Sequence, residues 1–267
     1  MKRFLCLFIL CVSANLLFAQ NSNYELKENI LYASSDADAY SKERCQIDVY
    51  YPKNKKDFVT VVWFHGGGLT GGGKEIPSYL KDKGIAVVGV GYRLSPKVKV
   101  EDIIKDAAKA VHWTFDHIGE YGGSNKKIVL SGHSAGGYLN LMLALNPRYL
   151  KDEGINADEL FGVVPFSAQC ISHFTSRAEK GIDINQPVVD EFAPLYWVRK
   201  NNVPITLITG DRELEMVGRY EENAYLARMF KIVGHPNIKL LELDGYDHGM
   251  AYPAFPILIK EIERWNK

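Results

Sequence analysis

Apolar, β-branched runs alternate along the chain with segments that have the 3.6-residue period of helices. Several of these runs are continuous, which is typical of strands covered on both faces. The runs predict strands at residues 44–51, 59–64, 85–90, 127–131, 161–166, 204–209 and 238–243. The helical period predicts helices at residues 100–118, 135–145, 217–233 and 254–265. The repeated order of strand and helix predicts an α/β fold with a mostly parallel sheet.

No Pro- or Ser-rich linker, internal repeat or low-complexity tract divides this pattern, so we expect one domain over residues 20–267. A chain of 267 residues is within reach of one large α/β domain, and 46% hydrophobic residues can form a full core. Basic and acidic residues both number 32. With no overall positive field to attract phosphates, we expect no nucleic-acid partner.

The first 19 residues have the pattern of a secretory signal peptide. Lys2 and Arg3 precede an apolar run at residues 4–18, and Ala19 is a small residue at the expected cleavage site. This run is shorter than the roughly 20 residues that span a bilayer, and an uncleaved membrane anchor is the alternative. We therefore expect a secreted or periplasmic protein with no stable membrane association after cleavage.

Four cysteines are too few for a disulfide scaffold, and none has the clustered spacing of a zinc site. Two of them, Cys45 and Cys170, lie outside the signal segment. They can pair in an oxidising compartment only if their Cα atoms lie within about 7 Å. The sequence leaves this pairing open.

A nucleophile-elbow pattern, G-x-S-x-G, is centred on Ser134. It follows the strand predicted at residues 127–131 and opens the helix predicted at 135–145, which is the context that this motif requires. The serine of such an elbow has a positive φ, and Gly132 and Gly136 leave room for the strand and helix to pass closely. A plain tight turn is the structural alternative. We take Ser134 as the candidate nucleophile.

A second glycine-rich stretch, His65 to Gly68, directly follows the strand predicted at residues 59–64. Consecutive glycines expose backbone N–H groups that can point at an oxygen that becomes negative during acyl transfer. The N–H of Ala135 adds a donor at the positive end of a helix dipole. A phosphate loop is the rival interpretation, but Lys74 is followed by Glu rather than Ser or Thr. We expect His65 to have a structural role.

A serine hydroxyl becomes a good nucleophile only when an imidazole accepts its proton. After an elbow of this kind the chain order is serine, acid and histidine, with the histidine after the last strand. His248 follows the strand predicted at 238–243 and is the candidate base. The strand before it leads into three carboxylates, Asp211, Glu213 and Glu215. We choose Asp211, which is closest to the strand and has the shorter side chain, and Glu213 stays open as the alternative.

Over about residues 46–265 the chain resembles α/β-hydrolases of the carboxylesterase and hormone-sensitive-lipase-like group, close to bacterial acetyl or feruloyl esterases. The resemblance lies in the stretches His65 to Gly68, Gly91 to Pro96, Gly132 to Gly137, Ala193 to Leu195, Gly210-Asp211 and His248-Gly249. It implies an α/β-hydrolase fold with a central sheet of about eight strands and no metal or cofactor. The site residues that it implies are nucleophile Ser134, base His248, orienting acid Asp211, and oxyanion donors Gly67, Gly68 and Ala135. Arg93 is similar to a structural residue of the group.

The sequence departs from many hormone-sensitive-lipase-like enzymes because no helical N-terminal cap precedes the first predicted strand, so we expect an open site. The one candidate cover is residues 170–202, which interrupt the strand–helix rhythm. This segment contains four aromatic residues, Phe174, Phe192, Tyr196 and Trp197. They either stack on an aryl or sugar group of a substrate or pack beneath a long excursion.

These features predict a secreted serine esterase that forms an acyl-enzyme, with acetyl or hydroxycinnamoyl esters on carbohydrate as substrates. A small-molecule or oligosaccharide ester is the expected partner. An arylformamidase or a peptidase of the same fold is the alternative; the former more often has Trp where this chain has Leu69. A non-catalytic ligand-binding or adhesion module is the alternative from another class. The sequence does not fix the oligomeric state.

Overall fold

A central eight-stranded sheet organises the protein, which we describe from a computed structural model. The structure describes residues 23–216 and 218–267, and the predicted signal segment at 1–19 lies outside the described residues. The strands are β1 (Tyr24–Leu31), β2 (Gln46–Pro52), β3 (Phe58–Phe64), β4 (Ala86–Val90), β5 (Gly123–His133), β6 (Gly162–Phe166), β7 (Ile205–Gly210) and β8 (Ile238–Leu243). Their order is β1-β2-β4-β3-β5-β6-β7-β8.

The sheet is mostly parallel, as the sequence predicts. Only β1 with β2 and β2 with β4 pair antiparallel, and every other neighbouring pair is parallel. All seven predicted strands are present, with ends shifted by a few residues. The prediction missed β1, an edge strand whose middle residues Lys27, Glu28 and Asn29 are exposed. Because neither face of this segment is regularly apolar, it carries little periodic signal.

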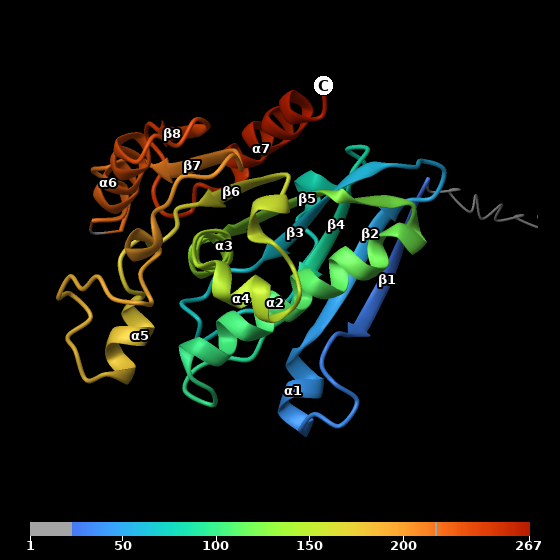
Figure 1. Cartoon of the computed structure of the whole chain (residues 1–267), viewed down its shortest axis with the longest axis horizontal. Helices are drawn as coiled ribbons and strands as arrows, with labels where there is room; N and C mark the ends of the chain where they lie inside the picture. The colour runs from blue at the N-terminus through green and yellow to red at the C-terminus, as the bar shows by residue number, and fades with distance from the viewer. Residues whose placement is uncertain (1–22, 217) are drawn as a thin grey trace, which may run out of the picture.

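Helices cover both faces of the sheet (Figure 1). They are α1 (Ala39–Arg44), α2 (Val100–His117), α3 (Ala135–Leu145), α4 (Pro147–Asp152), α5 (Phe174–Glu179), α6 (Arg219–Ile232) and α7 (Ala251–Trp265). The four predicted helices correspond to α2, α3, α6 and α7. Helices α1, α4 and α5 have six residues each, too few for an apolar period to stand out. None of the helices that the structure describes has the length and apolarity to cross a membrane.

The alternation of side chains along β3 divides the core into two layers. Phe58, Val62 and Phe64 face the layer that α2, α3 and α6 cover. Val59, Val61 and Trp63 face the layer under α7. Burial on both faces explains why this strand reads as a continuous apolar run.

The strand register brings the carboxyl ends of three parallel strands together. Phe64 at the end of β3 pairs with Gly132 near the end of β5, and His133 pairs with Phe166 at the end of β6. The loops that follow these strands therefore leave the sheet side by side. This edge is where an open α/β sheet places ligands.

The two cysteines of the described region, Cys45 and Cys170, are both free and buried. The pairing that the sequence left open is thus not made. The fold in this region does not depend on a disulfide.

Arg93 forms a partly buried ion pair with Asp106 of α2, in line with its predicted structural role. Its Nε and Nη2 donate to the two carboxylate oxygens at 2.7 Å each, and its backbone N–H donates at 3.2 Å. Hydrogen bonding to Asp106 raises the pKa of Arg93, so the guanidinium stays charged. This pair ties the chain after β4 to the covering helix.

The variant Arg93→Met is expected to lower the free energy of unfolding by about 3 kcal/mol, because it strands a buried carboxylate. Asp106 is only 3% exposed and cannot recover its hydration. Lys105→Met, on the same helix, removes only an exposed pair with Glu101 and should change stability by less than about 0.5 kcal/mol. Urea unfolding measures both. Equal effects would contradict the assigned role of Arg93.

Candidate active site

Ser134 lies in a strained turn between β5 and α3, as the elbow motif predicts. Its φ of 56° and ψ of −113° are unfavourable for a residue with a side chain. Its N–H donates to the carbonyl of Phe166 at 2.8 Å, which holds the turn against β6. A Cβ on Gly136 would lie 1.9 Å from the carbonyl oxygen of Phe64, and one on Gly132 would lie 2.5 Å from it. Only glycine therefore permits this approach of helix and strand.

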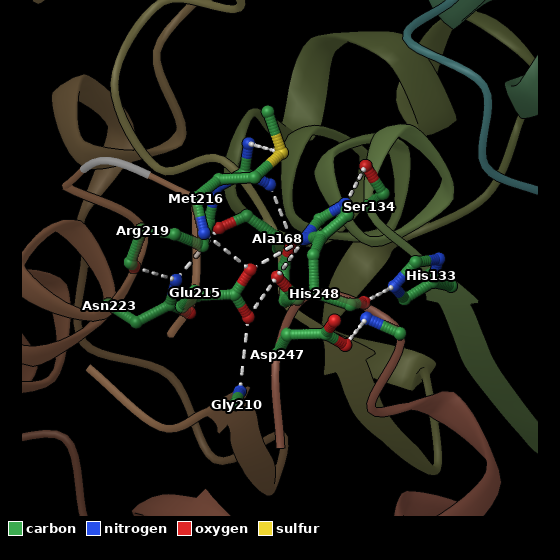
Figure 2. Close-up of polar contacts among 12 residues, drawn as sticks. His133, Ser134, Ala168, Gly210, Glu215, Met216, Arg219, Asn223, Asp247 and His248 are labelled. Carbon is green, nitrogen blue, oxygen red and sulfur yellow. Dashed lines mark hydrogen bonds and ion pairs between the residues drawn. The ribbon is translucent and has the colours of Figure 1, made fainter. Parts of the chain in front are cut away.

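His248 connects Ser134 to a buried carboxylate. Its Nε2 lies 2.9 Å from the Ser134 hydroxyl, and its Nδ1 lies 2.6 Å from Oε1 of Glu215. Figure 2 shows the imidazole between the other two side chains. Because an ionised carboxylate only accepts hydrogen bonds, Nδ1 carries the proton and Nε2 is free to accept one from the serine. The three side chains form a continuous hydrogen-bonded chain.

The Glu215 side chain is 0% exposed, and both of its carboxylate oxygens accept hydrogen bonds from protein groups. Burial by itself raises its pKa, but hydrogen bonds from His248, Ser167 and the N–H of Met216 outweigh this and lower the pKa to about 2. The N–H of Gly210 donates to Oε2 at 3.1 Å. The group is therefore a carboxylate at neutral pH, oriented on both oxygens.

The choice of Asp211 as the orienting acid was wrong. Its carboxylate accepts from the N–H groups of Glu213 and Gly245, each at 2.9 Å, while the imidazole Nδ1 bonds to Glu215. These two backbone hydrogen bonds lower its pKa. Asp211 thus joins the end of β7 to the loop that carries His248. Glu213, the alternative, is exposed.

A tight turn after β7 explains why the more distant carboxylate reaches the site. The N–H groups of Leu214 and Glu215 donate to the carbonyl of Asp211 at 3.0 and 2.8 Å. This turn reverses the chain, so the side chain of Glu215 returns over the end of β7 beside Gly210. Distance along the sequence from the strand end was the wrong criterion, because the turn brings the fifth residue back to it.

The predicted oxyanion donors lie beside the serine. A Cβ on Gly66 would lie 3.5 Å from the Cβ of Ser134, so the glycine loop passes directly over the elbow. Gly67 and Gly68 have φ values of 108° and 63°, which glycine adopts freely. Among the hydrogen bonds of the described residues, none uses the N–H of Gly67, Gly68 or Ala135. These donors are available to an incoming oxygen.

The glycine loop is held rigid by its surroundings. The N–H groups of Thr70 and Gly71 donate to the carbonyl of Gly67 at 3.0 Å. His65 stacks on Tyr92 with ring centroids 4.2 Å apart, and the Tyr92 hydroxyl donates to the His65 carbonyl at 2.7 Å. Burial lowers the pKa of His65 to about 4, so the ring is neutral. This matches the structural role expected for His65.

Helix α5, within the segment 170–202, fixes the other side of the glycine loop. The Thr175 hydroxyl donates to the Gly68 carbonyl at 2.6 Å. The Phe174 ring packs so close to Gly68 that a Cβ there would lie 2.9 Å from the ring. At the end of α5, Glu179 accepts from the N–H of Val100, the first residue of α2, at 2.9 Å. These contacts join α5, which lies at the lower left of Figure 1, to the glycine loop.

The other aromatic residues of this segment have local packing partners. The Lys180 ammonium lies over the Phe192 ring, 4.6 Å from the ring centroid. The Phe192 carbonyl accepts a hydrogen bond from the Tyr138 hydroxyl. Trp197 donates through Nε1 to the carbonyl of Glu191 at 2.8 Å. Tyr196 packs edge-on against Trp197 and is largely exposed. Of the four aromatics, Phe174 is the one whose ring packs against Gly68 of the glycine loop.

His133, next to Ser134, supports the loop that carries His248. Its Nε2–H donates to the carbonyl of His248 at 2.7 Å, and the two rings lie 4.8 Å apart (Figure 2). Burial and the nearby His248 lower the pKa of His133 to about 4. The neutral ring therefore acts as a hydrogen-bond donor to the backbone and adds no charge to the site.

Sequence reasoning missed Ser167, which follows β6 and contacts both Glu215 and His248. No motif marks it; its position directly after a parallel strand was the only available signal. No group of three or more His, Cys, Asp or Glu side chains with the arrangement of a metal site occurs within residues 23–216 and 218–267. The polar groups at this edge instead form one hydrogen-bonded network around Ser134. Such a network can activate the serine hydroxyl and stabilise a negative oxygen beside it.

Comparisons with known proteins agree with this geometry. The BD-FAE family profile matches residues 47–217, more than half of the chain. Esterase LipC of Mycobacterium tuberculosis is 23% identical over 86% of this chain and 61% of its own length. Carboxylesterase NlhH of the same organism is 28% identical over 63% of this chain and 56% of its own length. The chain thus spans at most about three fifths of these curated relatives.

Solved structures show the same fold. A truncated carbohydrate esterase from gut microbiota has a TM-score of 0.76 at 18% identity, covering 92% of this chain and 98% of that one. The apo form of Thermogutta terrifontis esterase 2 has a TM-score of 0.70 at 21% identity, covering 91% and 94%. At these identities the likeness establishes the fold alone. Together with the family match, it identifies the chain as a member of the BD-FAE family with the α/β-hydrolase fold.

Proposed function

We propose that the protein is a serine hydrolase that cleaves carboxylic esters through an acyl-enzyme. The hydrogen-bonded chain from Ser134 through His248 to Glu215 carries this proposal, because it can activate a serine as a nucleophile. Curated relatives named as an esterase and a carboxylesterase support it. The free N–H groups of the glycine loop and of Ala135 supply the second requirement, stabilisation of a negative oxygen.

In the first half of the reaction, the Ser134 oxygen attacks the ester carbonyl while Nε2 of His248 takes the hydroxyl proton. The carbonyl oxygen becomes an oxyanion that accepts hydrogen bonds from Gly67, Gly68 and Ala135. Glu215 keeps the proton of the imidazole on Nδ1 and stabilises the imidazolium that forms. The imidazolium then gives its Nε2 proton to the departing alcohol, and the C–O bond breaks.

In the second half, a water molecule replaces the alcohol. His248 takes a proton from this water as its oxygen attacks the acyl carbon, and the same N–H donors hold the second oxyanion. Collapse of the intermediate breaks the bond to Ser134, which regains its proton from the imidazolium. The carboxylic acid leaves, and the enzyme returns to its starting protonation state.

For the substrate, we propose acetyl or hydroxycinnamoyl esters linked to carbohydrate, and for the location, secretion by the signal segment expected at residues 1–19. A structural neighbour that is a carbohydrate esterase supports the first part. Helix α5 of the candidate cover is six residues long and is packed against the glycine loop, unlike a long amphipathic lid. A site without such a lid suits a bulky alcohol group.

Acetate release from acetylated xylo-oligosaccharides is expected to be faster, in kcat/KM, than hydrolysis of p-nitrophenyl esters with long acyl chains. The p-nitrophenyl series of increasing chain length is measured alongside. A preference for long acyl chains would refute the carbohydrate assignment and leave the esterase proposal standing.

A panel of four variants tests the catalytic roles. Ser134→Ala should lower kcat by roughly 10⁴-fold or more, and Glu215→Gln by roughly 10²- to 10⁴-fold, because each removes part of one catalytic unit. Glu213→Gln is the matched control and should keep activity close to wild type, and Asp211→Asn should lose far less activity than Glu215→Gln because Asp211 does not contact the imidazole. Hydrolysis of p-nitrophenyl acetate measures all four.

Covalent labelling by a fluorophosphonate ester separates an enzyme from a non-catalytic module of the same fold. The wild type should be labelled on Ser134, and Ser134→Ala should not. If the wild type resists labelling, or if Asp211→Asn is as damaging as Glu215→Gln, the proposed mechanism fails.

Thr175→Val is expected to lower kcat by about one order of magnitude with little change in KM, because the Gly68 carbonyl loses its hydrogen bond and the oxyanion donors lose their alignment. Thr114→Val is the matched control: it removes another buried threonine hydroxyl, which donates to the Ala110 carbonyl at 2.9 Å within α2. Steady-state kinetics and thermal unfolding of both variants are compared. Equal kinetic effects would show that α5 does not position the loop.

A further inference from the structure

Ser167 lies at the end of β6 in a backbone conformation that serine rarely adopts. Its φ is 46°, although it is not a glycine, and it is fully buried. Two hydrogen bonds hold this conformation: its N–H donates to the Ile208 carbonyl at 2.7 Å, and its carbonyl accepts from Nη1 of Arg219 at 2.5 Å. Strained residues of this kind persist where the surroundings over-determine them, and they gather at functional sites.

The Ser167 side chain meets both partners of the Glu215–His248 pair. Its Oγ lies 2.7 Å from Oε2 of Glu215 and 2.9 Å from Nδ1 of His248. Because the carboxylate can only accept, the hydroxyl proton of Ser167 is donated to Oε2. Towards the imidazole, the same oxygen then acts as an acceptor. The Nδ1 proton of His248 is shared between Oε1 of Glu215 and Oγ of Ser167.

This arrangement fixes the pair at two points. The Oε2 atom of Glu215 is held by the hydroxyl and by the N–H of Gly210, while Oε1 holds the imidazole and accepts from the N–H of Met216 at 3.0 Å. Without the hydroxyl, Oε2 keeps one donor instead of two, and the imidazole loses its second acceptor. The carboxylate group of Glu215 and the imidazole ring of His248 then both gain freedom to rotate. A small rotation of the imidazole moves Nε2 away from the Ser134 hydroxyl.

We propose that Ser167 is a positioning residue that aligns the Glu215 carboxylate and the His248 imidazole with Ser134. The kinetic part of this proposal rests on the esterase function proposed above. Ser167 lies on the Nδ1 side of the imidazole, opposite the nucleophile, so it acts through the pair and not on the substrate.

Two substitutions separate the hydroxyl from the strained backbone. Ser167→Gly removes the hydroxyl and places at φ 46° the residue that adopts this value most easily, so the fold should not suffer from backbone strain. Ser131→Ala is the matched control. Ser131 is also fully buried, and its hydroxyl donates to the Val164 carbonyl at 2.7 Å without touching the pair.

Ser167→Gly is expected to lower kcat for p-nitrophenyl acetate about tenfold with little change in KM, whereas Ser131→Ala should stay within about twofold of wild type. In a Glu215→Gln background, Ser167→Gly should have a clearly smaller further effect, because the hydrogen bond to the carboxylate is already lost and only the contact with the imidazole remains. A tenfold loss that persists in that background, or an equal loss in Ser131→Ala, would overturn the positioning role.

A readout independent of turnover is the low-field proton resonance of His248 Nδ1–H, assigned by its absence in His248→Gln. It should shift or broaden in Ser167→Gly and remain unchanged in Ser131→Ala. An unchanged resonance in Ser167→Gly would overturn the proposal. If the resonance shifts in Ser167→Gly as expected but the wild type hydrolyses no ester, the esterase function is refuted and the positioning geometry stays supported.

Discussion

The contact on which the site depends is the approach of α3 to the end of β3. Gly136 packs against the Phe64 carbonyl at a distance that no Cβ would allow, and Gly132 makes the same approach from β5. This contact forces the chain between them into the strained turn at Ser134. Because Phe64 is also the last residue of β3, the glycine loop that follows it starts within reach of the serine. One packing constraint thus places both the candidate nucleophile and the candidate oxyanion donors.

The features that the sequence predicted correctly are each carried by one continuous segment. The elbow at Ser134 and the loop from His65 to Gly68 depend on glycines at fixed spacing, and the surrounding strands are long apolar runs. His248 needed only its position after the last strand. The orienting acid could not be predicted in this way. Three carboxylates follow β7, and which of them contacts His248 depends on how the chain turns. Hydrogen bonds to the Asp211 carbonyl set that turn, and no spacing rule reveals them.

Ser167 and β1 were missed for related physical reasons. A serine after a strand is common, and what distinguishes Ser167 is its set of contacts with distant parts of the chain. Its backbone is held by Ile208 and Arg219. Its hydroxyl contacts Glu215 and His248. Strand β1 gains its structure from pairing with β2, while its own exposed polar residues weaken the apolar alternation. In each case the deciding interaction is long-range, which local periodicity does not record.

The choice between Glu215 and Asp211 follows a general balance between burial and hydrogen bonding. The Asp211 carboxylate is partly open to solvent, so an interaction with imidazolium there would be weakened by water. Glu215 has lost its water, and burial alone would favour its neutral form. Donors from His248, Ser167, Gly210 and Met216 replace that water and hold the charge in one orientation. In the proposed mechanism, a charge fixed in this way before reaction needs no reorganisation when the imidazolium forms.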